Sequence, residues 1–166
     1  MNQEIANPKG MLETVLMQEE ALQFDHFTAE DGWRLGSLVR EHVLRHGGNA
    51  AVDVTAFGVQ LFRATVGIAT PNNTRWIRRK AAVVMETWKS SLRALLEMHL
   101  SGRTLEEFGL RADDYVLSGG SFPIRLRGQG VVGAVTVSGL PQTHDHQMAA
   151  DAIAAFLGTA VPSILG

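Results

Sequence analysis

Residues 119–146, GGSFPIRLRGQGVVGAVTVSGLPQTHDH, predict two neighbouring strands that lead through a tight bend into a helix. In residues 124–127 apolar and basic side chains alternate, as they do in a strand with one buried face. A short glycine-containing connection over residues 128–130 leads to residues 131–138, which are apolar on both faces. The second strand is therefore expected inside the sheet, where Gly133 would let another segment approach closely.

The rest of the chain predicts helices around a second hairpin. The expected elements are helices over residues 12–22 and 28–46, strands over 51–57 and 59–66, a long helix from residue 73 or 74 to about 99, a short helical piece over 105–108, and a last helix over 143–157. Hairpins interrupted by a helix indicate an α+β fold, with a mostly antiparallel sheet of four or five strands flanked by helices. A single domain over residues 1–166 is expected, with residues 1–10 frayed.

Two further expectations rest on helical spacing and capping preferences. The long helix carries an apolar stripe that includes Trp76 and Trp88, which predicts that both tryptophans lie in the core. At the start of the last helix, Thr143 or Asp145 is expected to cap the first turn.

Composition and charge exclude several classes of protein. The net charge is −2 and no basic stripe dominates, which argues against nucleic-acid binding. Cysteine is absent, so thiol catalysis, disulfides and Fe–S clusters are excluded, and a reducing cytosol suits the chain. No apolar run approaches the roughly 18 residues of a membrane span, and no secretory signal pattern opens the chain. We therefore expect a cytoplasmic protein without a membrane segment.

His144-Asp145-His146 is the densest cluster of potential ligands. One interpretation is a metal or haem ligand, or an acid–base histidine at a helix start. The other is that Asp145 or Thr143 caps the helix and the imidazoles are solvated. Positions i and i+2 of a helix do not face one site, which favours the second interpretation. A metal would need further ligands that the sequence does not name, so no metal site is assigned.

Glycines and basic residues provide the other candidate sites. Residues 119–121, Gly-Gly-Ser, could cradle an anion through backbone N–H groups, but glycines that allow tight turning at a strand entrance explain them more simply. The basic cluster Arg75, Arg78, Arg79 and Lys80 is read as a solvated helix face in preference to an anion site. No serine lies in a GxSxG motif, so nucleophilic catalysis is unsupported.

Several motifs together resemble a known family. They are GGSFPIR at 119–125, the glycine pair at 128 and 130, GAVTVSGLP at 133–141 followed by Asp145-His146, QEE at 18–20, QLF at 60–62, PNN at 71–73, WIRRK at 76–80 and SS at 90–91. Over residues 12–158 the chain resembles the haem-degrading domain family, which includes GlcG-like and HbpS-like proteins and the carboxy-terminal domain of PduO-type proteins. It is most like the branch of uncharacterised bacterial and fungal proteins. The resemblance implies a profilin-like outline, homo-oligomers, and haem binding or degradation.

Three functional hypotheses follow. The first is a homo-oligomer that binds a small anionic ligand, with haem as one candidate, between the long helix and the central hairpin. The residues expected to form that site are Arg78, Arg79, Lys80, Gly119, Gly120, Arg125, Ser138, His144 and His146. The alternative is an oligomeric assembly or adaptor module with no small-molecule chemistry, in which the apolar second strand serves a subunit interface. A hydrolase or lyase ranks third, because spacing identifies no acid–base pair or nucleophile and no catalytic residue is assigned.

Overall fold

A four-stranded antiparallel sheet forms the centre of the computed structural model, which describes residues 5–166. The strands β1 (Ala50–Ala56), β2 (Val59–Val66), β3 (Ser121–Leu126) and β4 (Gly130–Ser138) lie in the order β2-β1-β4-β3. The predicted α+β class and both hairpins are confirmed. The strand that is apolar on both faces is indeed internal. At Gly133 the neighbouring β1 comes so close that a Cβ would lie 2.1 Å from the Thr55 carbonyl oxygen.

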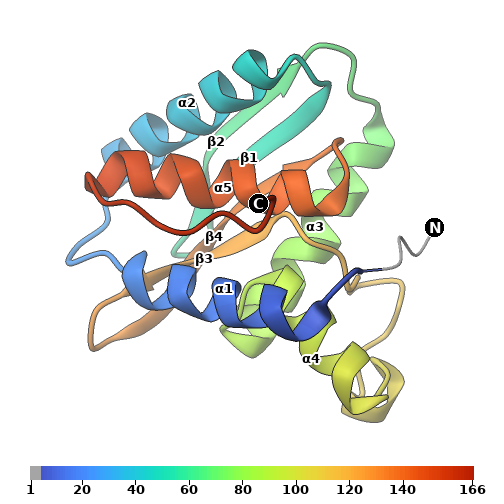
Figure 1. Cartoon of the computed structure of the whole chain (residues 1–166). Coiled ribbons are helices and arrows are strands. Elements are labelled where there is room, and N and C mark those ends of the chain that lie inside the picture. Colours follow the sequence, from blue (N-terminus) through green and yellow to red (C-terminus); the bar gives the residue numbers. More distant parts are fainter. Residues whose placement is uncertain (1–4) are drawn as a thin grey trace.

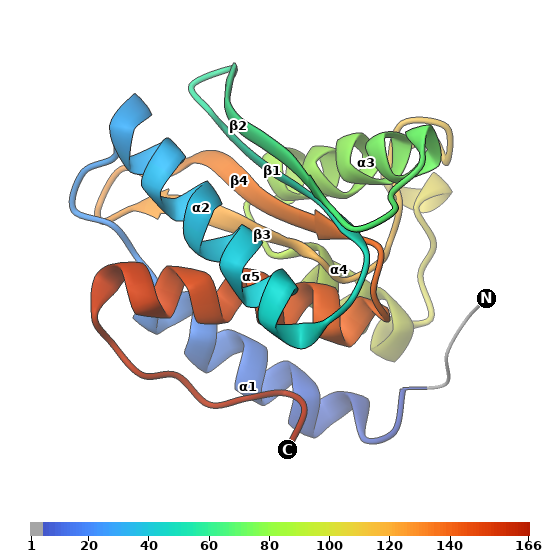
Figure 2. The same ribbon diagram turned by 90° about the horizontal axis from the view of Figure 1, so that it is seen from above.

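Helices cover both faces of this sheet. They are α1 (Pro8–Ala21), α2 (Ala29–His46), α3 (Pro71–Thr87), α4 (Ser91–Ser101), the 3₁₀ turn η1 (Glu106–Phe108) and α5 (Gln142–Leu157). Helices α2 and α5 lie on one face and α3 on the other (Figures 1 and 2). The main core lies between the sheet and the α2–α5 layer, and includes Leu35, Val39, Val52, Val54, Phe122, Ile124, Val135, Val137 and Ile153. None of the described helices combines the length and apolar character needed to cross a bilayer.

The C-terminal segment of the chain lies against α1 and α5. In Figure 1 the segment after α5 runs back between α5 and α1. The Gln18 side-chain amide donates to the Pro162 carbonyl oxygen at 2.7 Å, and the Gln147 side-chain oxygen accepts the Ile164 N–H at 2.9 Å. Two buried glutamines therefore hold the C-terminal segment against α1 and α5.

Helix α2 matches its sequence prediction at both ends. The Thr28 hydroxyl accepts the Asp31 N–H at 3.2 Å, and the Asp31 carboxylate accepts the Thr28 N–H at 2.9 Å, which completes a capping box. Gly47 ends the helix with φ at 78°, a conformation that glycine adopts without steric cost.

The single long helix predicted from residue 73 or 74 to 99 is wrong, because the structure divides it into α3 and α4. Trp88 ends α3 in the left-handed conformation with φ at 57°. Ser90 then caps α4, and the Glu19 carboxylate of α1 accepts the Ser90 N–H at 2.8 Å. A contact 71 residues away in sequence thus stabilises the break. Trp88, predicted as core, is 47% exposed.

Other predicted boundaries are corrected by local chemistry. Helix α3 begins earlier than expected, at Pro71, because Asn73 folds back and its side-chain oxygen accepts the Thr70 N–H at 2.8 Å. Helix α5 begins after Pro141 without a side-chain cap, so Thr143 does not cap it. The short helical piece is the 3₁₀ turn η1. Of residues 1–10, expected to be frayed, 8–10 belong to α1 and 1–4 lie outside the described residues.

Candidate functional site

A cavity of about 400 Å³ opens where the C-terminal end of β4 meets the first turns of α3 and α5. Pockets for small ligands usually have volumes of about 300–1,000 Å³. We call this the β4 cavity. Its lining consists of Asn72, Asn73, Trp76, Lys80, Val116, Leu117, Ser118, Ser138, Gly139, Leu140, Pro141, Gln142 and Asp145.

A buried ion pair lies at the base of the β4 cavity. The Lys80 ammonium nitrogen is 2.9 Å from the Asp145 carboxylate and 3.1 Å from the Val137 carbonyl oxygen. The two side chains are only 3% and 2% exposed. The pair joins α3 to α5 across the end of β4.

The environment of this pair disfavours its charges. Burial lowers the pKa of the Lys80 ammonium, and the attraction of Asp145 offsets this only in part. Burial also raises the pKa of the Asp145 carboxyl, against the effects of Lys80 and of two backbone N–H groups. Both shifts favour the neutral forms, so desolvation outweighs the attraction within the pair. Ionisable groups perturbed in this way beside a cavity are typical of functional sites.

The bend after β4 is shaped by the same carboxylate. Asp145 accepts the Leu140 N–H at 3.0 Å and the Gly139 N–H at 3.3 Å. Gly139 has φ at 150°, and a Cβ there would lie 2.2 Å from a backbone oxygen of the loop before β1, so only glycine fits. From α3, the Asn73 side-chain amide donates to the Ser138 carbonyl oxygen at 3.1 Å. These bonds bring the starts of α3 and α5 to the end of β4.

Several side chains that line the β4 cavity carry hydrogen-bond donors. The Gln142 side-chain oxygen accepts the Gly119 N–H at 3.1 Å, which leaves the Gln142 amide N–H groups for a ligand. The Trp76 indole and the Asn72 amide lie on the α3 side. Helix α3 has no acidic residue in its first turn, so its own side chains do not neutralise the positive end of its dipole. Asp145, the carboxylate of the lining, is engaged by Lys80 and by two backbone N–H groups.

Four of the sequence-predicted site residues meet at this cavity. Lys80 and Ser138 line it. Gly119 bonds to Gln142 at its rim. Gly120 packs on the ion pair, because a Cβ at this position would lie 2.7 Å from the Lys80 ammonium nitrogen. The basic cluster was interpreted as a solvated helix face, and for the buried Lys80 this interpretation is wrong.

The other predicted arginines lie elsewhere. Arg78 pairs with Asp114 at 3.2 Å, and Arg79 donates to the Ala112 carbonyl oxygen at 2.6 Å, so both hold the loop that follows η1. Arg125 donates to the Trp88 carbonyl oxygen, at the end of α3 opposite to the β4 cavity. The structure does not bring these three guanidinium groups into one anion site.

The two histidines of α5 point to different surroundings. His146 is fully buried, and its Nε2 lies 2.8 Å from the Gln18 side-chain oxygen while its ring packs against Phe122. The expectation of a solvated imidazole is therefore wrong for His146. His144 faces His46 of α2, with ring centroids 5.3 Å apart. Neither His144 nor His146 lines the β4 cavity.

Sequence reasoning missed several lining residues that a helical projection could have found. The missed residues Asn73 and Trp76 share one face of α3 with the predicted Lys80, because the three follow one another at spacings of three and four. The contribution of Gln142 depends on its bond to Gly119, 23 residues away, and no local pattern indicates it.

Comparison with known proteins identifies the family. A family model described as "Haem degrading protein HbpS-like" matches residues 27–154. The chain belongs to the HbpS-like family. Relatives of this HbpS-like chain include a UPF0303 protein of Rhizobium leguminosarum bv. trifolii, 42% identical over 146 residues (88% of this chain and 88% of the relative). A UPF0303 protein of Burkholderia mallei is 44% identical over 154 residues, which cover 92% of this chain and 93% of the relative.

Solved structures show the same fold. The crystal structure of Ybr137w superposes with a TM-score of 0.81 at 29% identity, over 89% of this chain and 87% of that chain. The crystal structure of HbpS has a TM-score of 0.64 at 22% identity, over 82% and 93% of the two chains. The haem complex of PduOC has a TM-score of 0.63 at 21% identity, over 82% and 97%. The predicted family and its fold are thereby confirmed.

Proposed function

We propose that this HbpS-like chain binds a small anionic ligand in the β4 cavity and acts as a cytoplasmic homo-oligomer. The donor set of the cavity carries the proposal. The lining includes side chains with amide and indole N–H donors, the start of α3 adds the positive end of its dipole, and the ammonium of Lys80 is buried beside Asp145.

The buried ammonium of Lys80 favours a negatively charged ligand. Burial lowers the pKa of the Lys80 ammonium even with Asp145 beside it. An anion held above Lys80 would stabilise the ammonium form, because opposite charges favour each other's ionised states. Asp145 would repel the anion, but its oxygens already accept hydrogen bonds from Lys80, Gly139 and Leu140.

Haem is the ligand that the family description suggests, and the β4 cavity does not fit a haem iron. Proteins hold haem iron through His, Cys, Met or Tyr side chains. The lining contains none of these residue types. The ring nitrogens Nδ1 of His144 and His146 are buried without a partner among the described residues, but both histidines lie outside this cavity. We therefore propose that the ligand of the β4 cavity is an anion bound by N–H donors, and not haem.

Removing the Gln142 amide should weaken anion binding. In a Trp33→Phe/Trp88→Phe background, Trp76 is the remaining tryptophan and reports on the cavity by fluorescence. Titration with succinate, citrate and inorganic phosphate should give a saturable change with at least one of them. Gln142→Ala should then weaken binding roughly 10-fold or more, because it removes a hydrogen bond to a charged group. Gln129→Ala, in the exposed turn at the far end of β4, is the matched control and should not change the affinity.

The same titration separates the anion proposal from haem binding. No saturable change with any of the three anions, or equal affinity of Gln142→Ala and the reporter protein, contradicts the proposal. With hemin, we expect the Soret spectra of the native protein and of His144→Ala to coincide. A Soret shift that His144→Ala abolishes would instead assign haem binding to the start of α5.

Two strained, exposed aromatic residues support the homo-oligomer and favour the assembly module as the second candidate function. Phe57 and Trp88 are left-handed, with φ of 55° and 57°, and they are 58% and 47% exposed. Both lie near the start of β4, because the Phe57 N–H donates to the Val132 carbonyl oxygen at 2.8 Å and a Cβ on Gly130 would lie 2.6 Å from the Trp88 ring. Bulky residues in this conformation cost roughly 1 kcal/mol or more. Exposed aromatics kept at that cost indicate a contact surface between copies.

Phe57→Asn should dissociate the assembly while it improves the turn. Asparagine tolerates positive φ, and Asn-Gly is the preferred sequence for a two-residue hairpin turn such as Phe57-Gly58. Size-exclusion chromatography with light scattering should give the native protein a mass that is a multiple of 18.0 kDa and the variant a mass closer to 18.0 kDa. Ile68→Asn, 82% exposed in the loop before α3, should keep the native mass. If the native protein has a mass of 18.0 kDa at every concentration, it is a monomer and the proposed assembly is contradicted. If the protein assembles but binds none of the three anions, the second candidate function, an assembly module, is the one supported.

A further inference from the structure

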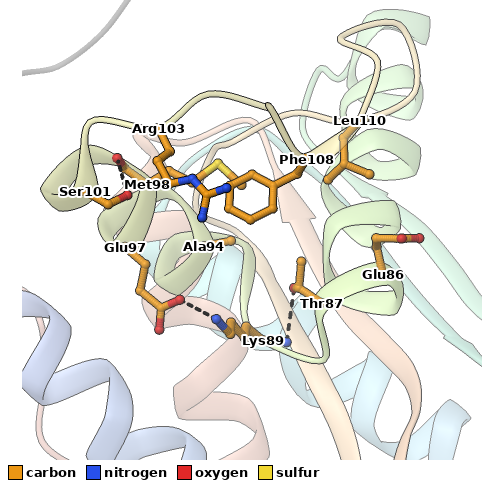
Figure 3. A pocket seen from close by; sticks show the side chains of 10 residues that line it. All are labelled: Glu86, Thr87, Lys89, Ala94, Glu97, Met98, Ser101, Arg103, Phe108 and Leu110. Atoms are coloured by element: carbon orange, nitrogen blue, oxygen red, sulfur yellow. Dashed lines mark hydrogen bonds and ion pairs between the residues drawn. The ribbon is translucent and has the colours of Figure 1, made fainter. Parts of the chain in front are cut away.

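A second cavity of about 420 Å³ lies at the opposite end of α3 from the β4 cavity. It opens between the last turn of α3, helix α4 and the segment around η1 (Figure 3). We call it the α4 cavity. Its lining consists of Glu86, Thr87, Lys89, Ala94, Glu97, Met98, Ser101, Arg103, Phe108 and Leu110.

The wall of the α4 cavity is apolar on two sides. Ala94 and Met98 come from one face of α4 and are nearly buried. Phe108 and Leu110 come from η1 and the residues after it. Together they form a surface of aliphatic, thioether and aromatic groups that suits the hydrocarbon part of a small molecule.

Among the described residues, one cationic side chain of this cavity, Arg103, has no carboxylate as an ion-pair partner. Glu97 already pairs with Lys89 and with Arg93, the latter at 2.7 Å. Within residues 5–166, no carboxylate forms an ion pair with Arg103. Its guanidinium carbon lies 4.1 Å from the centroid of the Phe108 ring.

The position of this guanidinium suits a carboxylate. Figure 3 shows the Arg103 guanidinium pointing into the cavity between Met98 and Phe108. The contact with the ring positions the guanidinium, while its N–H groups make no hydrogen bond within the described residues. A planar guanidinium held in this way can donate two parallel hydrogen bonds to one carboxylate.

Glu86 favours a ligand that carries a single carboxylate. It lies on the side of the cavity away from Arg103 in Figure 3. Its only hydrogen bond in the described chain is a long one, 3.4 Å from the Tyr115 hydroxyl. A second carboxylate at the far end of a ligand would therefore lie on the side of the cavity that carries this negative charge, and like charges repel.

We propose that the α4 cavity binds an aliphatic monocarboxylate, with the carboxylate on Arg103 and the unbranched tail on Met98, Phe108 and Leu110. This proposal does not rest on anion binding in the β4 cavity, because the two cavities share no lining residue.

Calorimetric titration of the native chain with butyrate, hexanoate and octanoate tests the proposal. Affinity should rise about fourfold for each added methylene group, which follows from the usual gain on burying a methylene. Arg103→Gln should weaken octanoate binding roughly 10-fold or more, since it removes a charge-assisted contact. Arg111→Gln, exposed and outside the lining, is the matched control and should bind octanoate like the native chain.

Two further arms distinguish the roles of the charges. Octanedioate should bind the native chain more weakly than octanoate, and Glu86→Gln should reduce that difference. Gln142→Ala, in the β4 cavity, should leave octanoate binding unchanged. A flat chain-length series, an Arg103→Gln variant with native affinity, or a loss of octanoate binding in Gln142→Ala would each overturn the assignment. An octanedioate affinity that Glu86→Gln does not change would overturn the role of Glu86.

Discussion

Lys80→Met should lower the free energy of unfolding by about 3–5 kcal/mol, the usual cost of removing one partner of a buried ion pair. The Asp145 carboxylate would lose its ammonium partner and keep only the Gly139 and Leu140 N–H groups. Because the Asp145 side chain is only 2% exposed, water would replace little of the lost interaction. Urea unfolding at neutral pH, followed by circular dichroism, measures the change.

Two variants show whether the loss comes from the uncompensated charge. In Lys80→Met/Asp145→Asn the amide oxygen still accepts from the loop without a net charge, so the double variant should regain at least about 2 kcal/mol over Lys80→Met. Arg78→Met, on the same helix, breaks an ion pair whose side chains are 59% and 51% exposed, and should change stability little. A double variant no more stable than Lys80→Met would show that Lys80 acts through packing instead.

The elements that were predicted correctly are those whose pattern is local. The central hairpin follows from alternating side chains and a glycine turn, and α2 follows from its capping box and terminal glycine. The division into α3 and α4 was missed because the apolar spacing continues in phase across it. The start of α4 is stabilised by the local Ser90 cap, whose hydroxyl accepts the Arg93 N–H, and by the bond from the Ser90 N–H to Glu19 of a distant helix, so the spacing of apolar residues alone could not place it.

The candidate site divides in a similar way. Arg78, Arg79 and Lys80 look alike in sequence, but successive residues of a helix point about 100° apart, and of the three Lys80 is the one whose side chain is fully buried. Its neighbours at spacings of three and four, Ile77, Val83 and Val84, are buried, and this spacing could have separated Lys80 from the two arginines. The burial of His146 could not be foreseen in this way, because its partner Gln18 is 128 residues away.

The native protein should lose about 2 kcal/mol of stability between pH 7.5 and pH 5 because of His146 alone. Burial lowers the pKa of this imidazole from 6.5 to about 3, with no opposing charge nearby. Since the folded-state pKa lies below the unfolded one, the stability contribution is complete above pH 6.5 and is lost as the pH falls toward 3. Unfolding the chain in urea at a series of pH values measures this slope.

His146→Gln isolates this contribution, because glutamine does not titrate but can still donate to the Gln18 side-chain oxygen. Burial also lowers the pKa of His42, and carboxylates protonate in the same range, but these groups are present in both proteins and cancel in the difference. His26→Gln, at an exposed position, should follow the native curve. If His146→Gln kept the native slope, a proton would have to be accommodated at Nδ1 in the fold. That atom is buried without a partner among the described residues, and the ring packs against Phe122, so protonating the imidazole costs more free energy in the folded state than in the unfolded state.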